Sequence, residues 1–224
     1  MKPTNQTDQN SNKIYEKAFR KFIVDKNHPC IMAHSVHQTQ GLFLRSYPDF
    51  DTQSTARQLV TDIKEYIQQY DFGDNKFASF IAVFPEVSFK DEKSFEQALW
   101  QLLNQIHQVD NANWDSSVSA DPASNNFSFS IAGRAFYIVG MHPRSSRKAR
   151  QAPYVSIAFN LHAQFEKLRE MGSYEVVKKR IRKRDKAFQG SINPVLADFG
   201  DASEARQYSG RKTEKNWKCP FHKA

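Results

Sequence analysis

The sequence lacks the features that anchor or cross-link extracellular and membrane proteins. It has two cysteines in 224 residues, Cys30 and Cys219, which are too few for a disulfide framework. No apolar run approaches the ~20 residues that a membrane span needs, and the polar segment 1–13 has no secretory signal. We therefore expect a soluble cytoplasmic protein without a membrane partner. Residues 1–13 are expected to be a disordered tail, and residues 14–224 a single domain.

Common nucleotide and hydrolase motifs are absent as well. The chain contains no P-loop, no G-x-G-x-x-G, no G-x-S-x-G and no H-E-x-x-H. Each motif places specific groups against phosphates, a nucleophile or zinc. Their absence disfavours nucleotide kinases, Rossmann dehydrogenases, α/β-hydrolases and zincin proteases.

Positive charge is concentrated in one region. The chain carries a formal charge of +8, yet residues 142–184 contain twelve Lys or Arg and three Glu, a net +9. Such a region attracts anions. A nucleic acid, a small phosphate or carboxylate ligand, and an ordinary solvated surface all remain open. A nucleic-acid site is disfavoured because KKRIRKR (178–184) lacks interleaved aromatic residues that would stack on bases.

The apolar spacing predicts an α+β fold, with a mainly antiparallel sheet and helices packed on it. Helices are expected over residues 14–24, 54–70, 91–109, 162–171 and 174–188. Strands are expected over 28–36, 42–50, 77–84, 127–133, 134–143 and 152–160. The strands 127–133 and 134–143 meet at a turn formed by Gly133 and Arg134, which favours antiparallel pairing.

Two histidines follow predicted strands, where ligands and catalytic groups are common. His142 precedes a proline and a basic loop, and His162 opens a predicted helix. A neutral imidazole is the usual protein ligand of heme iron. For each histidine, an ordinary structural role remains open.

A zinc site is a weaker alternative. His28, Cys30 and His34 would share one face of a straight strand, and Cys219 and His222 form C-x-x-H near the other end of the chain. The spacing is uncommon for zinc, so a buried structural Cys30 is favoured.

The segment 189–211 is irregular but contains both apolar and charged residues. Long irregular segments of this kind are usually functional or disordered, and the apolar residues argue against disorder. Its carboxylates could pair with a cationic substrate group, since Asp and Glu bind a guanidinium through two hydrogen bonds. The candidate substrate-binding residues of the segment are Asp198, Glu204, Arg206 and Tyr208.

Four stretches together resemble the YqcI/YcgG family. They are HPCIMAH (28–34), the stretch from Gly140 to Glu170, the stretch from Ile181 to Arg211, and WKCPF (217–221). The likeness covers about residues 20 to 221 and is densest after residue 140. The resemblance implies heme chemistry, because characterised relatives are heme-dependent hydroxylases of a guanidine nitrogen of L-arginine or a related amino acid.

The resemblance also ranks the candidate residues for binding the heme. The H-P-x-x-S-R-x-x-R element, His142 to Arg150, makes His142 the first choice as the ligand of the heme b iron, ahead of His162 and Cys30. Arg147 and Arg150 would hold heme propionates or a substrate carboxylate.

The expected activity follows from these assignments. It is a monooxygenase-type N-hydroxylation of a small guanidino or amino-acid-like substrate. Because the chain has no flavin or iron–sulfur motif, reducing equivalents would come from an external electron donor or from peroxide. Two alternatives remain: a non-catalytic heme-binding or sensing protein, and a basic nucleic-acid-binding protein. The oligomeric state is open, with a homodimer as one option.

Overall fold

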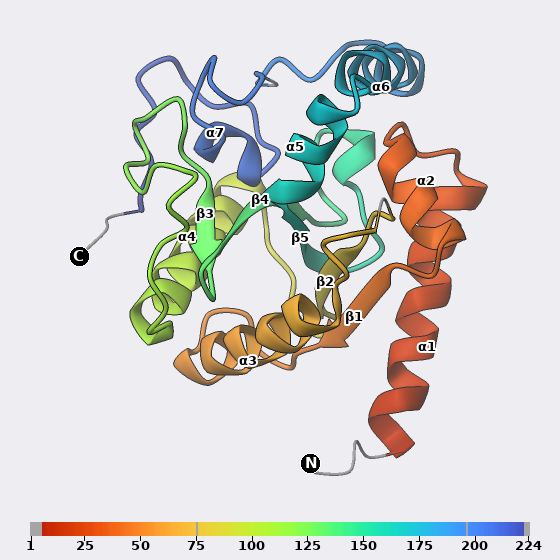
Figure 1. Ribbon diagram of the computed structural model, residues 1–224. Helices are drawn as coiled ribbons and strands as arrows, with labels where there is room; N and C mark the ends of the chain where they lie inside the picture. Colours follow the sequence, from red (N-terminus) through yellow and green to blue (C-terminus); the bar gives the residue numbers. More distant parts are fainter. Residues whose placement is uncertain (1–5, 75, 196, 222–224) are drawn as a thin grey trace.

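The computed structural model describes residues 6–74, 76–195 and 197–221, and it contains one five-stranded sheet surrounded by helices (Figure 1). The strand order is β1-β2-β5-β4-β3. β1 pairs with β2 in parallel, and the other three pairings are antiparallel. The strands are β1 (Leu42–Ser46), β2 (Ser79–Phe84), β3 (Phe129–Ile131), β4 (Arg134–Met141) and β5 (Val155–Leu161). The predicted α+β class, with a mainly antiparallel sheet, is confirmed.

The helices match most of the predicted segments. They are α1 (Gln6–Arg20), the π-helical turn η1 (Lys21–Asp25), α2 (Ile31–Gln38), α3 (Gln53–Gln69), α4 (Glu92–Val109), the 3-10 turn η2 (Lys148–Arg150), α5 (His162–Glu170), α6 (Tyr174–Gln189) and α7 (Ala205–Tyr208). Thr52 caps α3 by accepting a hydrogen bond from the Thr55 N–H at 3.1 Å. α1 begins at Gln6, so residues 6–13 of the expected tail are helical. Residues 1–5 lie outside the described residues.

The predicted strand over residues 28–36 is wrong. Most of this segment forms α2, for which Cys30 is the N-cap residue. Short apolar runs fit a strand and a helix equally well, and periodicity alone cannot separate them. The change matters because His28, Cys30 and His34 do not alternate along one extended strand.

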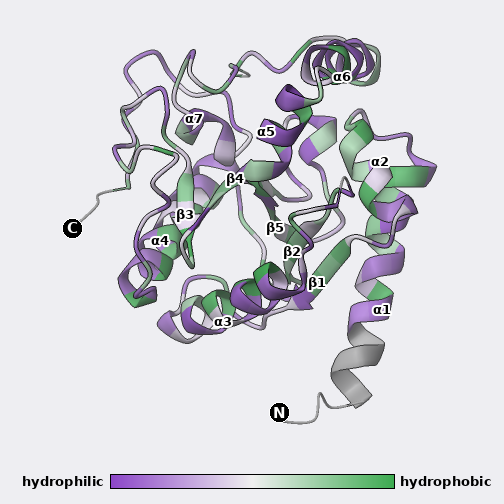
Figure 2. Ribbon diagram, in the orientation of Figure 1, coloured by the Kyte–Doolittle hydropathy of each residue, from purple (hydrophilic) through white to green (hydrophobic). Residues whose placement is uncertain are grey.

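The alternation of side chains along the strands gives the sheet two different faces. On β2, Phe80, Ala82 and Phe84 join one hydrophobic cluster, whereas Ile81 and Val83 join a second. The first cluster lies against α3 and α4 and the second against α1 and η1. Figure 2 shows that the strands are mostly hydrophobic and α6 mostly hydrophilic.

The face covered by α3 and α4 is filled with large apolar side chains. Phe95, Leu99 and Leu103 of α4 are fully buried there. Gly140 of β4 allows this close approach: a Cβ at that position would lie 2.8 Å from the Phe95 ring and 2.9 Å from the Tyr208 carbonyl oxygen. We refer to this side of the sheet as the closed face.

Across the described part of the chain, no helix combines the length and the apolar character required to cross a bilayer.

Candidate active-site cavity

The other face of the sheet borders a cavity of about 350 Å³, a size in the range of small-molecule sites. Its floor is formed by β2, β4 and β5, and α2, α5, α6 and the segment that leads to α7 enclose it. Apolar side chains make up much of the wall, among them Ile23, Val139, Ala158 and Ile181. We refer to this side as the cavity face.

His162 lies where β5 passes directly into α5, and its ring lines the cavity. Its Nε2 lies 3.0 Å from Glu166 Oε1, one helical turn further along α5. Its Nδ1 is buried and has no hydrogen-bond partner among the described residues. Burial lowers the pKa of the imidazole, and Glu166 opposes this shift in part. A proton on Nε2 that is donated to Glu166 leaves a lone pair on Nδ1, as in histidines that bind metals or accept protons.

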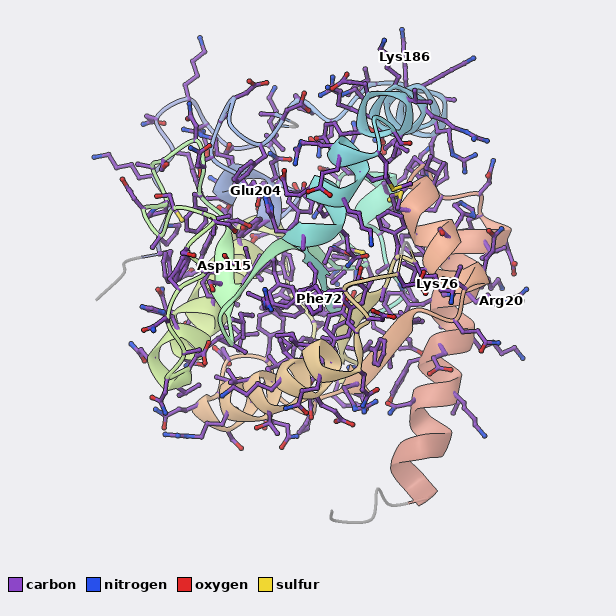
Figure 3. The ribbon with its side chains drawn as sticks, viewed as in Figure 1. Arg20, Phe72, Lys76, Asp115, Lys186 and Glu204 are labelled. Atoms are coloured by element: carbon purple, nitrogen blue, oxygen red, sulfur yellow. The ribbon has the colours of Figure 1, made fainter. Side chains whose placement is uncertain are left out.

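Glu204 is the second ionisable group on this part of the wall, next to α7. Its Oε1 lies 4.0 Å from His162 Nδ1, and the Tyr208 hydroxyl donates to its Oε2 at 3.4 Å. Burial raises the pKa of Glu204 to about 8. At neutral pH this carboxyl group can therefore hold a proton or release one, which suits acid–base chemistry. Figure 3 shows Glu204 in the interior, between α7 and α5.

Arg147 and Arg150 line the cavity as the sequence predicts, but both guanidinium groups already have protein partners. Arg147 donates to Asp185 Oδ2 at 2.6 Å and to Ser191 Oγ at 3.0 Å. Arg150 donates to the backbone carbonyls of Gly140 at 2.9 Å and Gln207 at 3.1 Å. No carboxylate of residues 6–74, 76–195 or 197–221 forms an ion pair with Arg150. This buried cation favours a bound anion in the cavity.

Cys30 and His28 lie on the α2 side of the cavity. Burial raises the pKa of the Cys30 thiol, although the backbone N–H groups of Ala33 and Met32 act in the opposite direction. Both His28 nitrogens are engaged: Nε2 donates to the Ala149 carbonyl at 2.9 Å, and Nδ1 accepts from the Cys30 N–H at 3.2 Å. Burial lowers the His28 pKa to about 4.

The zinc alternative finds no support. Within the ranges that the structure describes, no group of three or more His, Cys, Asp or Glu side chains could hold a metal ion. The prediction required a straight strand, but the segment is a turn followed by α2. His222 lies outside the described residues.

His142, the first choice for the heme ligand, does not line the cavity. Its buried ring packs against Phe95 of α4, with 4.6 Å between ring centroids. Its backbone N–H donates to the Arg150 carbonyl at 3.0 Å. The sequence placed His142 correctly at the end of a strand but could not show which face of the sheet it adjoins.

The candidate substrate-binding residues divide into two groups. Asp198 and Glu204 line the cavity, but Asp198 pairs with Lys178 at 2.7 Å and Arg182 at 3.2 Å. Tyr208 does not line it: its ring stacks on Trp100 in the core, and its hydroxyl reaches Glu204.

Arg206 does not line the cavity either. It donates to the backbone carbonyls of Glu214 and Trp217 and lies over the Trp217 ring. The physical reason is local: α7 is a single turn, so neighbouring side chains point in different directions. Arg206 therefore stabilises the C-terminal segment.

Tyr137 and Gln207 are among the polar residues of the cavity wall that sequence reasoning missed. The Tyr137 hydroxyl donates to Gln207 Oε1 at 2.9 Å, and Gln207 Nε2 donates to the Ala197 carbonyl at 3.1 Å. Burial raises the pKa of Tyr137 to about 12. Alternation along the predicted strand 134–143 places the side chain of Tyr137 on the face of the sheet opposite that of Phe136. This alternation could have indicated that Tyr137 faces away from the aromatic core. Gln207 had no such signal.

Comparison with known proteins agrees with the resemblance seen in the sequence. Residues 19–222 match the YqcI/YcgG family. The chain belongs to this family. It is 29% identical over 205 residues to a protein of Bacillus subtilis (strain 168) named uncharacterized protein YqcI, and the match covers 87% of this chain and 80% of that relative. No solved structure matches the chain.

The YqcI/YcgG match spans almost all of the structure, from the end of α1 through the C-terminal segment. All the strands and the cavity-lining elements α2, α5 and α6 therefore lie within it. The name of the Bacillus relative states no activity, so a functional conclusion has to come from the cavity.

Proposed function

We propose that this YqcI/YcgG protein is a heme-dependent enzyme that N-hydroxylates a small guanidino or amino-acid-like substrate in the cavity. The observation that carries the proposal is His162. Its Nδ1 is buried and unpartnered beside an apolar cavity, while Glu166 engages Nε2. Ligand histidines usually have this arrangement, in which the second nitrogen donates to a carboxylate.

The residues of the cavity fit a heme. Apolar walls suit the macrocycle, and its propionates would pair with the wall cations Arg169, Lys178 and Arg182 in place of their present partners Glu166 and Asp198. His162 would hold the iron, and Cys30 is the competing donor because it lines the same cavity. Burial of the thiol opposes the thiolate form that iron requires, which favours His162. When bound, heme supplies the activation of oxygen that no side chain can provide.

The remaining residues suit a substrate that carries both charges. Glu204 offers a carboxyl group to a guanidinium or amine, and Arg150 offers a buried cation to a carboxylate. Glu204 can also hold or release a proton at its carboxyl oxygen, since its pKa lies near 8. The apolar wall excludes water and strengthens these interactions.

Hemin titration into the purified protein, followed by absorption spectroscopy, tests the proposal. We expect a Soret band in the wild type that is lost or shifted in His162→Ala. His142→Ala is the matched control, since that histidine is also buried but lies away from the cavity, and it should retain the band. A band that changes only in Cys30→Ser would identify the thiolate as the ligand.

Turnover separates an enzyme from a heme-binding or sensing protein. With a reductant present, oxygen consumption should rise when L-arginine or a related guanidino compound is added, and Glu204→Gln should suppress this rise. The absence of a Soret band in the wild type would refute the proposal. Heme binding without substrate-dependent oxygen consumption would leave only the binding or sensing role.

A further inference from the structure

The outward face of α6 carries a cluster of unpaired cations. Four cationic side chains of this helix are exposed, and none of them forms an ion pair with a residue in the described parts of the chain. They are Lys179, Arg180, Lys183 and Lys186. Figure 3 shows Lys186 pointing away from the body of the protein. We call these four residues the α6 cation cluster.

The other cations of α6 have defined partners. Lys178 and Arg182 bind Asp198. Arg184 donates to the carbonyl oxygens of Pro29 and His28 and to Asn27 Oδ1. The inner cations of α6 therefore stabilise the fold through their partners. The α6 cation cluster makes no such contact with the described residues.

Exposed apolar side chains border the same helix. Of five large apolar residues that are exposed in the described ranges, Met171 lies between α5 and α6, Val176 lies in the first turn of α6, and Ile192 lies just beyond its end. Val176 is the most exposed of them, at 69%. Scattered apolar residues alone are common on protein surfaces, but beside unpaired cations they make this face suitable for a partner of complementary charge.

The inner side of α6 forms part of the cavity wall. Val177, Ile181 and Arg182 line the cavity, so a single helix, about 10–12 Å in diameter, separates the α6 cation cluster from it. A partner that binds the cluster would lie close to whatever the cavity contains.

From this arrangement we infer that the outer face of α6 docks an acidic one-electron carrier protein, of the iron–sulfur or flavin class. The inference rests on the proposed function. Hydroxylation of an N–H bond by O2 consumes two electrons and two protons: one oxygen atom enters the N–H bond and the other leaves as water. The carrier supplies the two electrons, one at a time, and is itself oxidised.

The outer face of α6 suits a protein partner better than a nucleic acid or a membrane. Base stacking needs exposed aromatic rings, and the two aromatic residues of α6, Tyr174 and Phe188, are half-buried. A helix that lies in a membrane turns its apolar face outward, whereas Val177 and Ile181 face the cavity. An acidic protein matches both the charge and the scattered apolar residues.

The test is a charge reversal of the full-length protein. We would measure the binding of an acidic [2Fe–2S] ferredoxin and of an acidic flavodoxin to the wild type and to Lys179→Glu/Arg180→Glu/Lys183→Glu. The matched control is Arg57→Glu/Lys90→Glu/Lys93→Glu, which makes the same charge change at exposed residues in or near α3 and α4. Hemin titration of each variant reports on the cavity independently.

The inference predicts that one carrier binds the wild type in a salt-sensitive manner, that the α6 variant raises the dissociation constant roughly tenfold or more, and that the control changes little. Equal weakening in both variants would indicate an effect of net charge and overturn it, as would the absence of carrier binding. Loss of binding to a nucleic acid or to anionic vesicles instead would assign the surface to that partner. Failure of carrier binding with a normal Soret band refutes only this inference, whereas a missing Soret band refutes the proposed function.

Discussion

The closed face and the cavity face of the sheet use the same strands in different ways. On the closed face, α3 and α4 pack large rings and aliphatic side chains onto alternate strand residues. On the cavity face, the intervening strand residues border a cavity with buried His, Glu and Arg side chains. The comparison indicates that one face supplies stability, and that this allows the other to keep groups whose burial costs free energy.

Large-to-small substitutions should destabilise the closed face more than the cavity face. Leu103→Ala on the closed face should lower the free energy of unfolding by about 3 kcal/mol, because it leaves a cavity in a filled core. Ile181→Ala, whose side chain already borders open space, should cost about 1 kcal/mol. Urea unfolding monitored by circular dichroism measures both. Equal losses would show that the two faces are packed alike.

Buried and exposed ion pairs should also differ. Asp185→Asn removes the carboxylate that pairs with Arg147 at 2.6 Å and leaves a buried cation. It should cost about 2–4 kcal/mol. Glu65→Gln, which removes an exposed pair with Arg45 at 3.6 Å, should cost less than about 0.5 kcal/mol. Chemical denaturation at neutral pH provides the comparison, and a small effect of Asp185→Asn would show that the cavity face is wetter than its burial suggests.

Glu204 should make stability depend on pH. Burial raises its folded pKa from 4.5 to about 8, so the folded protein binds this proton more tightly than the unfolded chain does. Its contribution therefore falls as pH rises from about 4.5 to about 8, by a few kcal/mol at most. Glu204→Gln should flatten the pH profile of the free energy of unfolding over that window. An unchanged pH profile in Glu204→Gln would show that burial does not raise the pKa of Glu204.

The smallest expected effect comes from adding carbon atoms. The side chain of Ala158 lines the cavity. Ala158→Val should change the free energy of unfolding by less than about 1 kcal/mol and should weaken hemin binding. Gly140→Ala, on the neighbouring strand but toward the closed face, would meet the Phe95 ring and should cost about 1–3 kcal/mol. Thermal unfolding and hemin titration of the two variants separate filling a cavity from overpacking a core. Equal destabilisation would mean that the cavity cannot accept even two methyl groups.

Sequence patterns were most informative where an element repeats its apolar spacing. The residues expected to face inward from 91–109 are buried in α4, and the strand run 77–84 is buried on both faces as β2. The helix α2 was missed because eight residues with one buried position, Val36, carry little periodicity. Local pattern therefore identified the regular core and failed at the short element beside the cavity.

The candidate site shows the same division. Glu204, Asp198, Cys30 and His162 were singled out from the sequence, and all four line one cavity although the chain separates them widely. His142 and Tyr208 were singled out with equal reason and lie outside it. Residue chemistry showed which groups could act, but not which of them face the same space.

The sequence by itself determined the α+β class, the amphipathic helices and the region that carries the positive charge, because these depend on spacing and composition along the chain. The tertiary structure alone decided which side of the sheet each ionisable group occupies. That choice depends on strand order and on which helix covers which face, as when β5 between β2 and β4 brings His162 toward Glu204 while Phe95 of α4 covers His142. Such contacts join residues far apart in the chain, and local spacing contains no information about them.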